Sequence, residues 1–427
     1  MDKLQQVELV TRTGPGTPMG ALMRRYWVPF LLSEELPEPD CPPVRVKLMS
    51  EELIAFRDTL NRIGLIDRYC AHRGVSLWFG RNEECGLRCP YHGWKYDVNG
   101  NCMEIPSAPE GTAHFKRMKL KSYPCVEKGG VIWTYMGPPQ LQPAFPDFEW
   151  MSLPEGNRYI AKRWQECNWL QAMEGGIDSS HVSFLHSGEL DHDPLHKNTK
   201  GSVFQRDRAP KFEVLESAGG LLIGARRNAE PGHYYWRVTQ WIMPWYTMIP
   251  PYGDNALNGH AWVPIDDENV ITWSFTYHPA RPLAEPELAT MRKGGGMHVE
   301  LVPGTFRPVI NKDNDYMMDR AAQKSGRTYS GVMGIAMQDA SLQESMGPIQ
   351  NRAKEHLVST DAAIMMARRR LFNAAQALQD HGTAPPGLDV ATHRVRSVST
   401  SLPVDKAFQD ALVEDLKVRE GVGHTSI

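Results

Sequence analysis

Two cysteines and two histidines in the first quarter of the chain have the types and spacing of metal ligands. One residue separates Cys70 from His72, two separate Cys89 from His92, and sixteen lie between the two pairs. Each pair is short enough to occupy one loop. Two such loops, brought together, offer two thiolates and two imidazoles to a single site.

This ligand set fits a Rieske [2Fe–2S] centre, in which two Cys hold one iron and two His hold the other. Zinc is the alternative, because Zn²⁺ also takes Cys and His ligands. Zinc fingers usually present both cysteines before both histidines, whereas here the two types alternate along the chain. The order therefore favours the Rieske cluster. Cys85, four residues before Cys89, is the one other cysteine that could plausibly act as a ligand, as a decoy for the true site.

A second group of metal-ligand side chains follows in a segment rich in helix formers, residues 164–184. On one helix Glu174, Asp178 and His181 fall at i, i+4 and i+7, so we expect them to share a face. His186 would lie about 140° further around an ideal helix than His181. The Ser-Gly pair after His186 predicts that the helix ends there and that its imidazole turns back toward His181.

Two histidines and one carboxylate form the facial triad of non-haem Fe(II) oxygenases, which leaves coordination positions open for O₂ and substrate. A helical histidine pair alone is weak evidence, but an electron carrier in the same chain implies a redox acceptor. The competing pair His192 and His196 is interrupted by Pro194, which favours a loop. The residues leave the third ligand open among several downstream acidic side chains: Asp313, Asp315, Asp319, Asp339 and Asp361.

The pattern around these residues predicts a two-domain α+β protein, with domains at 1–147 and 148–427. In the first domain a helix at 19–27, ended by Pro29, precedes short alternating runs that predict an all-β barrel or sandwich carrying the two ligand loops. The predicted strands and hairpins are at 44–48, 53–56, 64–66, 95–101 and 126–135. In the second domain we expect an antiparallel sheet with helices. Its predicted elements are the helix at 164–184, strands at 212–225, 234–243 and 270–277, and a long helix at 344–378 that exposes Arg368, Arg369 and Arg370 to solvent.

Composition sets the broad class. A net charge of −3 gives no sign of nucleic-acid or polybasic membrane binding. No run reaches the 18 apolar residues of a transmembrane helix, and residues 1–10 are too polar for a signal peptide. The seven cysteines lack disulfide-like spacing, so we expect a cytoplasmic protein.

Taken in order, the motifs Cys70-x-His72, Cys89-x-x-His92 and Glu174-x₃-Asp178-x₂-His181-x₄-His186 resemble the catalytic subunit of Rieske non-haem iron aromatic-ring-hydroxylating oxygenases. Two further stretches, 14–20 and 338–349, are similar to the phthalate dioxygenase branch, so the resemblance covers nearly the whole chain.

The resemblance implies that His181, His186 and Asp339 bind mononuclear Fe(II) and that Asp178 is a bridging carboxylate. Asp178 would accept hydrogen bonds from His181 and from His92 of the partner subunit, so that the electron crosses between chains. The family further implies an N-terminal Rieske domain, a helix-grip catalytic domain, and a homotrimer that can stack as a hexamer.

Electrons must come from elsewhere, because the chain has neither a Gly-x-Gly-x-x-Gly after a strand nor plant-type ferredoxin Cys spacing. We therefore expect a separate NADH-dependent flavin and iron–sulfur reductase. Asp178 also fits a supporting role, since a carboxylate on a metal-bound imidazole fixes its tautomer.

The branch acts on aromatic carboxylates, and a carboxylate favours arginine as its partner in an otherwise apolar pocket. Arg206 and Arg208 follow the predicted iron-binding helix, Arg237 shares a strand face with aromatic residues, and Ser179 offers a hydroxyl. We expect that the enzyme uses O₂ to cis-dihydroxylate an aromatic acid. Phthalate, isophthalate and a chlorobenzoate are left open as the substrate. Three alternatives remain: O-demethylation of a methoxybenzoate by a Rieske monooxygenase, an electron-transfer Rieske protein, and a zinc-stabilised binding module.

Overall fold

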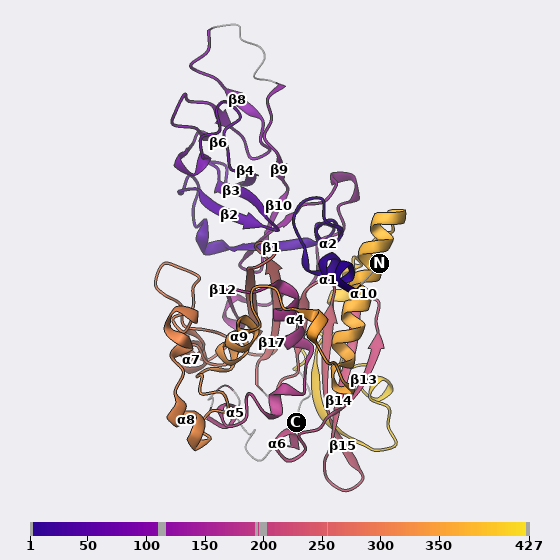
Figure 1. The fold of residues 1–427 in the computed structure, drawn as a ribbon. Helices are drawn as coiled ribbons and strands as arrows, with labels where there is room; N and C mark the ends of the chain where they lie inside the picture. Colours follow the sequence, from indigo (N-terminus) through magenta and orange to yellow (C-terminus); the bar gives the residue numbers. More distant parts are fainter. Residues whose placement is uncertain (1–2, 110–116, 193–194, 196–202, 254, 424–427) are drawn as a thin grey trace. The chain divides into compact units, whose positions relative to one another are not determined.

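The computed structural model describes residues 3–109, 117–192, 195, 203–253 and 255–423 (Figure 1). The chain forms two compact units. Residues 14–16 and 23–143 form the smaller unit, and residues 1–13, 17–22 and 144–427 form the larger one. The domain ranges expected from the sequence, 1–147 and 148–427, stay a prediction.

The smaller unit is built from three antiparallel sheets, as its alternating runs predict. The first is β2 (Val44–Leu48), β3 (Glu51–Arg57), β4 (Ile63–Asp67) and β9 (Ser122–Tyr123). The second is β5 (Arg81–Glu83), β6 (Gly86–Arg88), β7 (Lys95–Tyr96) and β8 (Cys102–Glu104). The third is β1 (Trp27–Leu32), β11 (Val131–Tyr135) and β10 (Cys125–Lys128). Cys70 and Cys89 both lie in a core cluster with residues of the first two sheets.

The helix expected at 19–27 is shorter than the sequence pattern indicates. Helix α2 covers Pro18–Met23, and Trp27 already begins β1, whose six residues are all buried. Pro29 does not end a helix but lies in β1, where the register with β11 shifts. The apolar residues that suggested a helical face lie on a buried helix as far as Met23, and the pairing of β1 with β11 sets where the helix must end, so tertiary packing overrides local propensity there.

The larger unit is organised around one antiparallel sheet with the strand order β12-β18-β17-β16-β15-β14-β13, with β19 also paired to β15. The strands are β12 (Arg158–Gln165), β13 (Lys211–Glu216), β14 (Gly220–Asn228), β15 (His233–Ile242), β16 (Tyr246–Ile249), β17 (Leu257–Pro264), β18 (Val270–Tyr277) and β19 (Val398–Pro403). The run expected as one strand at 212–225 is a hairpin, because Ser217 and Gly220 close a turn between β13 and β14.

Helices accompany this sheet, as expected for an α+β fold. The two that matter for the site are α4 (Trp169–Ile177) and α9 (Ile335–Ser345), and α4 packs against both β17 and α9. The others are α1 (Lys3–Thr11), α3 (Glu149–Ser152), α5 (Glu189–His192), α6 (Val203–Arg206), α7 (Glu285–Arg292), α8 (Arg320–Ser325), α10 (Ala362–His381) and α11 (Phe408–Ala411). Within the described residues, no helix has the length and apolar character needed to span a membrane.

Two helix predictions are wrong in their bounds. The segment 164–184 begins as the end of β12, and α4 starts only at Trp169, where the Asn168 side chain accepts a hydrogen bond from Leu170 N at 3.1 Å. The long helix at 344–378 is two helices, since α9 ends at Ser345 and α10 starts at Ala362. Gly347, with φ of 91°, and the proline after it cannot continue an α-helix.

The run of three arginines in α10 is not the solvated face that we expected. Arg368 is largely buried and binds Glu174 and Glu355, and Arg370 is 3.2 Å from Glu216. Only Arg369 is exposed.

Candidate metal centres

The end of helix α4 positions the first two predicted iron ligands. The helix ends at Ile177, and Asp178 has non-helical φ and ψ of −92° and 111°. Its Oδ1 accepts a hydrogen bond from Ser180 N at 2.7 Å, the kind of side chain to backbone bond that competes with a helix. His181 then begins a single 3₁₀ turn, η6 (His181–Ser183). Glu174, Asp178 and His181 therefore do not share one helical face, and that prediction is wrong.

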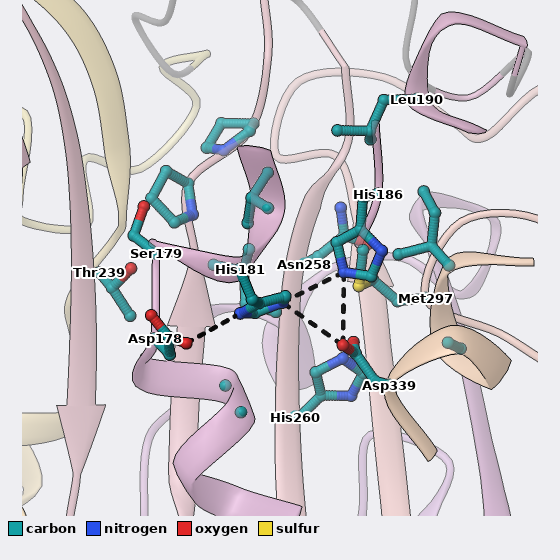
Figure 2. A pocket seen from close by; sticks show the side chains of 18 of the residues that line it. Asp178, Ser179, His181, His186, Leu190, Thr239, Asn258, His260, Met297 and Asp339 are labelled. Atoms are coloured by element: carbon teal, nitrogen blue, oxygen red, sulfur yellow. Dashed lines mark hydrogen bonds and ion pairs between the residues drawn. The ribbon is translucent and has the colours of Figure 1, made fainter. Parts of the chain in front are cut away.

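Despite the break, the structure brings His181, His186 and Asp339 together (Figure 2). The Nε2 atoms of the two histidines are 3.2 Å apart, and each is 3.4 Å from Oδ1 of Asp339. Of the five acidic side chains that the residues alone left open, Asp339 is the one in this group, because α9 packs beside α4.

These separations fit a metal site. Two donor atoms that are each about 2.1 Å from one metal and about 100° apart lie about 3.2 Å from one another. Burial disfavours charge here, but the carboxylates of Asp178 and Asp339 outweigh it and raise the pKa of His181 to about 10. A divalent cation would displace that proton, because imidazole binds metals in its neutral form.

Each histidine has a polar side chain beside its other ring nitrogen. Asp178 Oδ2 lies 3.4 Å from Nδ1 of His181, as the sequence-based role of this carboxylate requires. Nδ1 of His186 lies 2.8 Å from Oε1 of Gln338. We did not assign Gln338 a role from the sequence, and its place directly before Asp339 is the only signal that could have suggested one.

Glu174 does not face the metal group but holds α4 in place. Its carboxylate accepts hydrogen bonds from Arg352 Nη1 at 3.0 and 2.8 Å and from Arg368 Nε and Nη2 at 2.6 and 3.0 Å. Glu355 binds Arg368 from the other side at 2.6 and 2.8 Å. This buried network ties α4 to α10 at a point four residues before Asp178.

Two glycines let α4 approach its neighbours closely, Gly176 toward the sheet and Gly175 toward α9. A Cβ on Gly176 would lie 2.2 Å from Cη2 of Trp262 on β17, and a Cβ on Gly175 would lie 2.2 Å from Nε2 of Gln343. No side chain fits at either position without movement of its neighbour. The helix backbone and the Trp262 ring therefore meet directly beside the metal group.

A pocket opens beside the metal group, between α4, α9 and the sheet. Its walls include apolar side chains, among them Val182, Leu190, Ile249, Trp262 and Met297. Figure 2 shows Leu190 and Met297 with the three clustered side chains, and Ser179 and Thr239 beside Asp178. The pocket thus combines an apolar wall with a few polar groups, as ligand sites commonly do.

Two of the four predicted substrate residues line this pocket. Arg237 and Ser179 are both buried there. Arg206 and Arg208 are exposed and do not line it: Arg206 lies 3.4 Å from Glu230, and Arg208 lies 5.6 Å from the ring centre of Phe184.

The sequence also missed two polar groups of the sheet that line the pocket. Arg163 on β12 is buried, and burial lowers its pKa to about 10. His260 on β17 is also buried, and burial followed by the charge of Arg163 lowers its pKa to about 4, so it is neutral at pH 7. Both sit in strands with mixed polar and apolar faces, and neither has a spacing signal that singles it out.

In the smaller unit, the predicted cluster ligands come together as a histidine pair and a cysteine pair. The rings of His72 and His92 are 4.5 Å apart, and His72 stacks on Trp94 at 4.7 Å. Cys70 and Cys89 are buried, and burial and the nearby Cys70 raise the pKa of Cys89.

The polar atoms around these residues fit a cluster. Tyr96 Oη accepts a hydrogen bond from Ala71 N at 3.1 Å, so its own proton is available to Cys70 Sγ at 3.2 Å. Nδ1 of His92 is buried and has no hydrogen-bond partner among the described residues. Cys85, the decoy, lies outside the core that contains Cys70.

Comparison with known proteins agrees with both sites. Residues 26–124 match the Rieske [2Fe–2S] domain, and residues 134–411 match the family described as LigXa C-terminal domain like. The chain is 39% identical over 400 residues to the 3-chlorobenzoate-3,4-dioxygenase oxygenase subunit of Comamonas testosteroni, covering 90% of this chain and 91% of the relative. The chain belongs to the Rieske non-haem iron ring-hydroxylating oxygenases, in the phthalate dioxygenase-like branch.

Two further similarities concern this oxygenase as a whole. It is 38% identical over 383 residues to the phthalate 4,5-dioxygenase oxygenase subunit of Pseudomonas putida, covering 87% of this chain and 85% of the relative. Its fold resembles that of dicamba monooxygenase bound to 3,6-dichlorosalicylic acid, with a TM-score of 0.59 at 18% identity, over 84% of this chain and 100% of that one.

As a Rieske oxygenase, the protein is a ring-hydroxylating oxidoreductase whose cofactors are a [2Fe–2S] cluster and mononuclear Fe(II). The family match excludes the zinc-stabilised binding module and the protein that only transfers electrons.

Proposed function

We propose that this Rieske oxygenase cis-dihydroxylates an aromatic carboxylate, with a phthalate-type acid favoured over isophthalate or a chlorobenzoate. The observation that carries the proposal is Arg237, a buried guanidinium in the wall of the pocket beside His181, His186 and Asp339.

Arg237 has the properties of an anion-binding group. Its Nη2 donates to Pro250 O at 3.2 Å and its guanidinium lies 4.2 Å from the ring centre of Tyr252, but Nη1 has no hydrogen-bond partner among the described residues. Arginine stays charged in proteins, and a buried charge without a partner is costly. The hydroxyl of Ser179 is likewise buried without a partner in the described part of the chain. A substrate carboxylate would satisfy both groups.

The rest of the pocket suits an aromatic ring. Its apolar walls would hold a planar ring and keep water away from the metal group. The names of the two similar oxygenase subunits, which act on 3-chlorobenzoate and phthalate, support an aromatic acid as the substrate.

In this proposal each group of residues has a separate role. His181, His186 and Asp339 would hold Fe(II), and Cys70 with Cys89, together with the nearby histidine pair His72 and His92, would hold the cluster. Fe(II) held by these residues would supply O₂ activation. Asp178 holds the Nδ1 proton of His181 and so keeps Nε2 available to the metal. Arg237 orients the ring through its carboxylate, and Ser179 adds a second hydrogen bond.

Electron delivery requires partners in this proposal. A separate NADH-dependent flavin and iron–sulfur reductase would reduce the cluster. Asp178 would accept a hydrogen bond from His92 of the partner subunit in a homotrimer, possible also as a stacked hexamer, so that assembly is part of the mechanism.

A single-turnover assay tests the proposed reaction. Chemically reduced protein is mixed with O₂ and with phthalate, isophthalate, 3-chlorobenzoate or a methoxybenzoate, and products are read by mass spectrometry. A cis-dihydrodiol from one acid would support dioxygenation and name the substrate. Formaldehyde and a phenol from the methoxybenzoate would show that the reaction is O-demethylation and not dioxygenation. No product from any acid, with both iron sites loaded, would overturn the proposal.

The role of Arg237 is tested in the same assay with a matched control. Arg237→Met should raise KM for the acid by about 10- to 100-fold, since a hydrogen bond to a charged group contributes about 1.5–3 kcal/mol. Arg206→Met, which removes an exposed arginine outside the pocket, should leave KM unchanged. Equal effects of the two substitutions would argue against a carboxylate contact at Arg237.

A further inference from the structure

We propose that Gln338 is a positioning residue that fixes the ring tautomer of His186, so that the His186 Nε2 lone pair faces Asp339 and His181. This inference rests on the proposed assignment of His186 as an iron ligand.

The hydrogen bonds of Gln338 define which way its amide points. Gln338 Nε2 lies 3.1 Å from Val332 O, and a carbonyl oxygen can only accept, so this end of the amide must be the NH₂ group. Oε1 therefore faces His186 Nδ1 at 2.8 Å. An amide oxygen can only accept as well, so Nδ1 carries a proton, and in the neutral ring that binds a metal Nε2 keeps its lone pair.

The surroundings hold this amide in one orientation. Gln338 is fully buried in the first turns of α9. The Val332 carbonyl is presented by a turn in which Gly331, with φ of 84°, donates its N–H to Thr328 Oγ1 at 2.7 Å. A Cβ on Gly331 would lie 2.9 Å from Asp319 O, so this turn requires glycine. The carbonyl that orients Gln338 is thus fixed by the backbone itself.

The two histidines of the metal group therefore have chemically different partners. His181 faces a carboxylate, Asp178, whereas His186 faces a neutral amide. A carboxylate raises the basicity of the imidazole more than an amide does, while either fixes the tautomer. Gln338 accordingly contributes orientation to His186 without adding a second negative charge beside the metal.

The experiment measures Fe(II) affinity by competition with a chelator in the full-length protein. Gln338→Met keeps the length of the side chain but removes the acceptor, and it should weaken Fe(II) binding by about 10- to 100-fold. Gln338→Glu keeps an acceptor for Nδ1 and should lose less affinity than Gln338→Met. The EPR spectrum of the Fe(II)–nitrosyl adduct is a second readout, which should change in Gln338→Met and stay closer to wild type in Gln338→Glu.

The matched control is Gln171→Leu. Gln171 is another buried glutamine: it donates to the backbone oxygens of Gln343 and Gly347 at 2.9 Å and accepts from Gln350 N at 2.8 Å, and none of these hydrogen bonds involves either histidine. Its loss should lower stability yet leave the Fe(II) dissociation constant and the nitrosyl spectrum unchanged. A general packing defect would instead affect both glutamine sites alike.

Two results would overturn the inference. Wild-type affinity in Gln338→Met, or equal losses in Gln338→Met and Gln338→Glu, would show that the acceptor on Nδ1 does not matter. His186→Ala separates this failure from that of the ligand assignment: unchanged iron content in His186→Ala would remove His186 from the metal site itself. If Gln338→Met does not fold, Gln338→Glu is compared with wild type instead. A change in its Fe(II) affinity and nitrosyl spectrum larger than the change seen in Gln171→Leu would count against the inference.

Discussion

Removing the charge of Glu174 is expected to be strongly destabilising, although this residue does not touch the metal group. Its carboxylate receives four hydrogen bonds, and the Arg352 side chain that supplies two of them is 2% exposed. Glu174→Gln leaves the buried Arg352 guanidinium with a neutral amide oxygen in place of this carboxylate, and with Glu355 at 3.3 Å as its remaining carboxylate partner. Breaking a buried pair in this way costs about 3–5 kcal/mol.

Thermal unfolding measures this loss. For a unit of this size each kcal/mol shifts Tm by about 2–4 °C, so Glu174→Gln should lower Tm by about 6–20 °C. The matched control is Glu213→Gln, because Glu213 lies 3.2 Å from Arg226 but is 44% exposed. Such a surface pair contributes about 0–1 kcal/mol, so its Tm should change by a few degrees at most.

A double variant distinguishes the charge from the packing. In Glu174→Leu/Arg352→Leu no uncompensated charge is left, and Arg368 keeps Glu355 at 2.6 and 2.8 Å. Replacing a buried ion pair by apolar residues is often neutral or stabilising, so the double variant should recover much of the lost Tm. A Tm of Glu174→Gln within 2 °C of wild type, or a double variant less stable than Glu174→Gln, would refute this reasoning.

Four further predictions concern the metal sites and the pH dependence of stability. Asp339→Ala should lose mononuclear iron while the visible spectrum of the cluster persists; unchanged iron content would point to another carboxylate. Asp178→Asn should keep both metals but slow reoxidation of the reduced cluster by O₂ and substrate about 10- to 100-fold in stopped-flow measurements, and full turnover would remove the bridging role. Cys89→Ser should abolish the cluster spectrum and Cys85→Ser should leave it intact, whereas loss of the spectrum in both would bring Cys85 back as a ligand. Burial lowers the pKa of His393 to about 4, so the unfolded chain binds a proton that the folded one excludes as pH falls below about 6.5. The free energy of unfolding is therefore at its full value above pH 6.5 and decreases toward pH 4, by about 2 kcal/mol between pH 7 and 5. His393→Gln should show a smaller drop in Tm over that interval. An unchanged drop would mean that His393 is not buried as a neutral ring.

Local chemistry made the cluster site and the fold class predictable. Thiolate and imidazole pairs two or three residues apart must lie on one loop, whatever the rest of the chain does, so Cys70 to His92 could be interpreted without knowing the fold. The same holds for the alternation of β18, whose bounds the sequence predicted as the structure has them. Strand periodicity likewise placed Arg237 on a face of β15 that lines the pocket.

What the sequence could not supply depends on contacts between distant segments. Asp339 lies beside His181 only because α9 packs on α4. The residue types alone could not show which of the five acidic candidates is the third ligand. The bounds of α4 were missed because pairing with β18 draws residues up to Gln165 into β12. Arg206 and Arg208 follow the iron-binding segment in sequence, but nearness along the chain does not place a side chain in the pocket.

The contact between Gly176 and Trp262 has a consequence for how this pocket can change during evolution. The two positions share one space: a Cβ at 176 would lie 2.2 Å from the indole, so the glycine can be replaced only if the residue at 262 becomes smaller. Trp262 and Gly176 both line the pocket. A shift to larger substrates is therefore open through position 262 alone, whereas a change at position 176 must follow a change at 262. Related chains that carry a residue larger than glycine at position 176 should therefore carry one smaller than tryptophan at position 262, whereas position 262 can differ on its own.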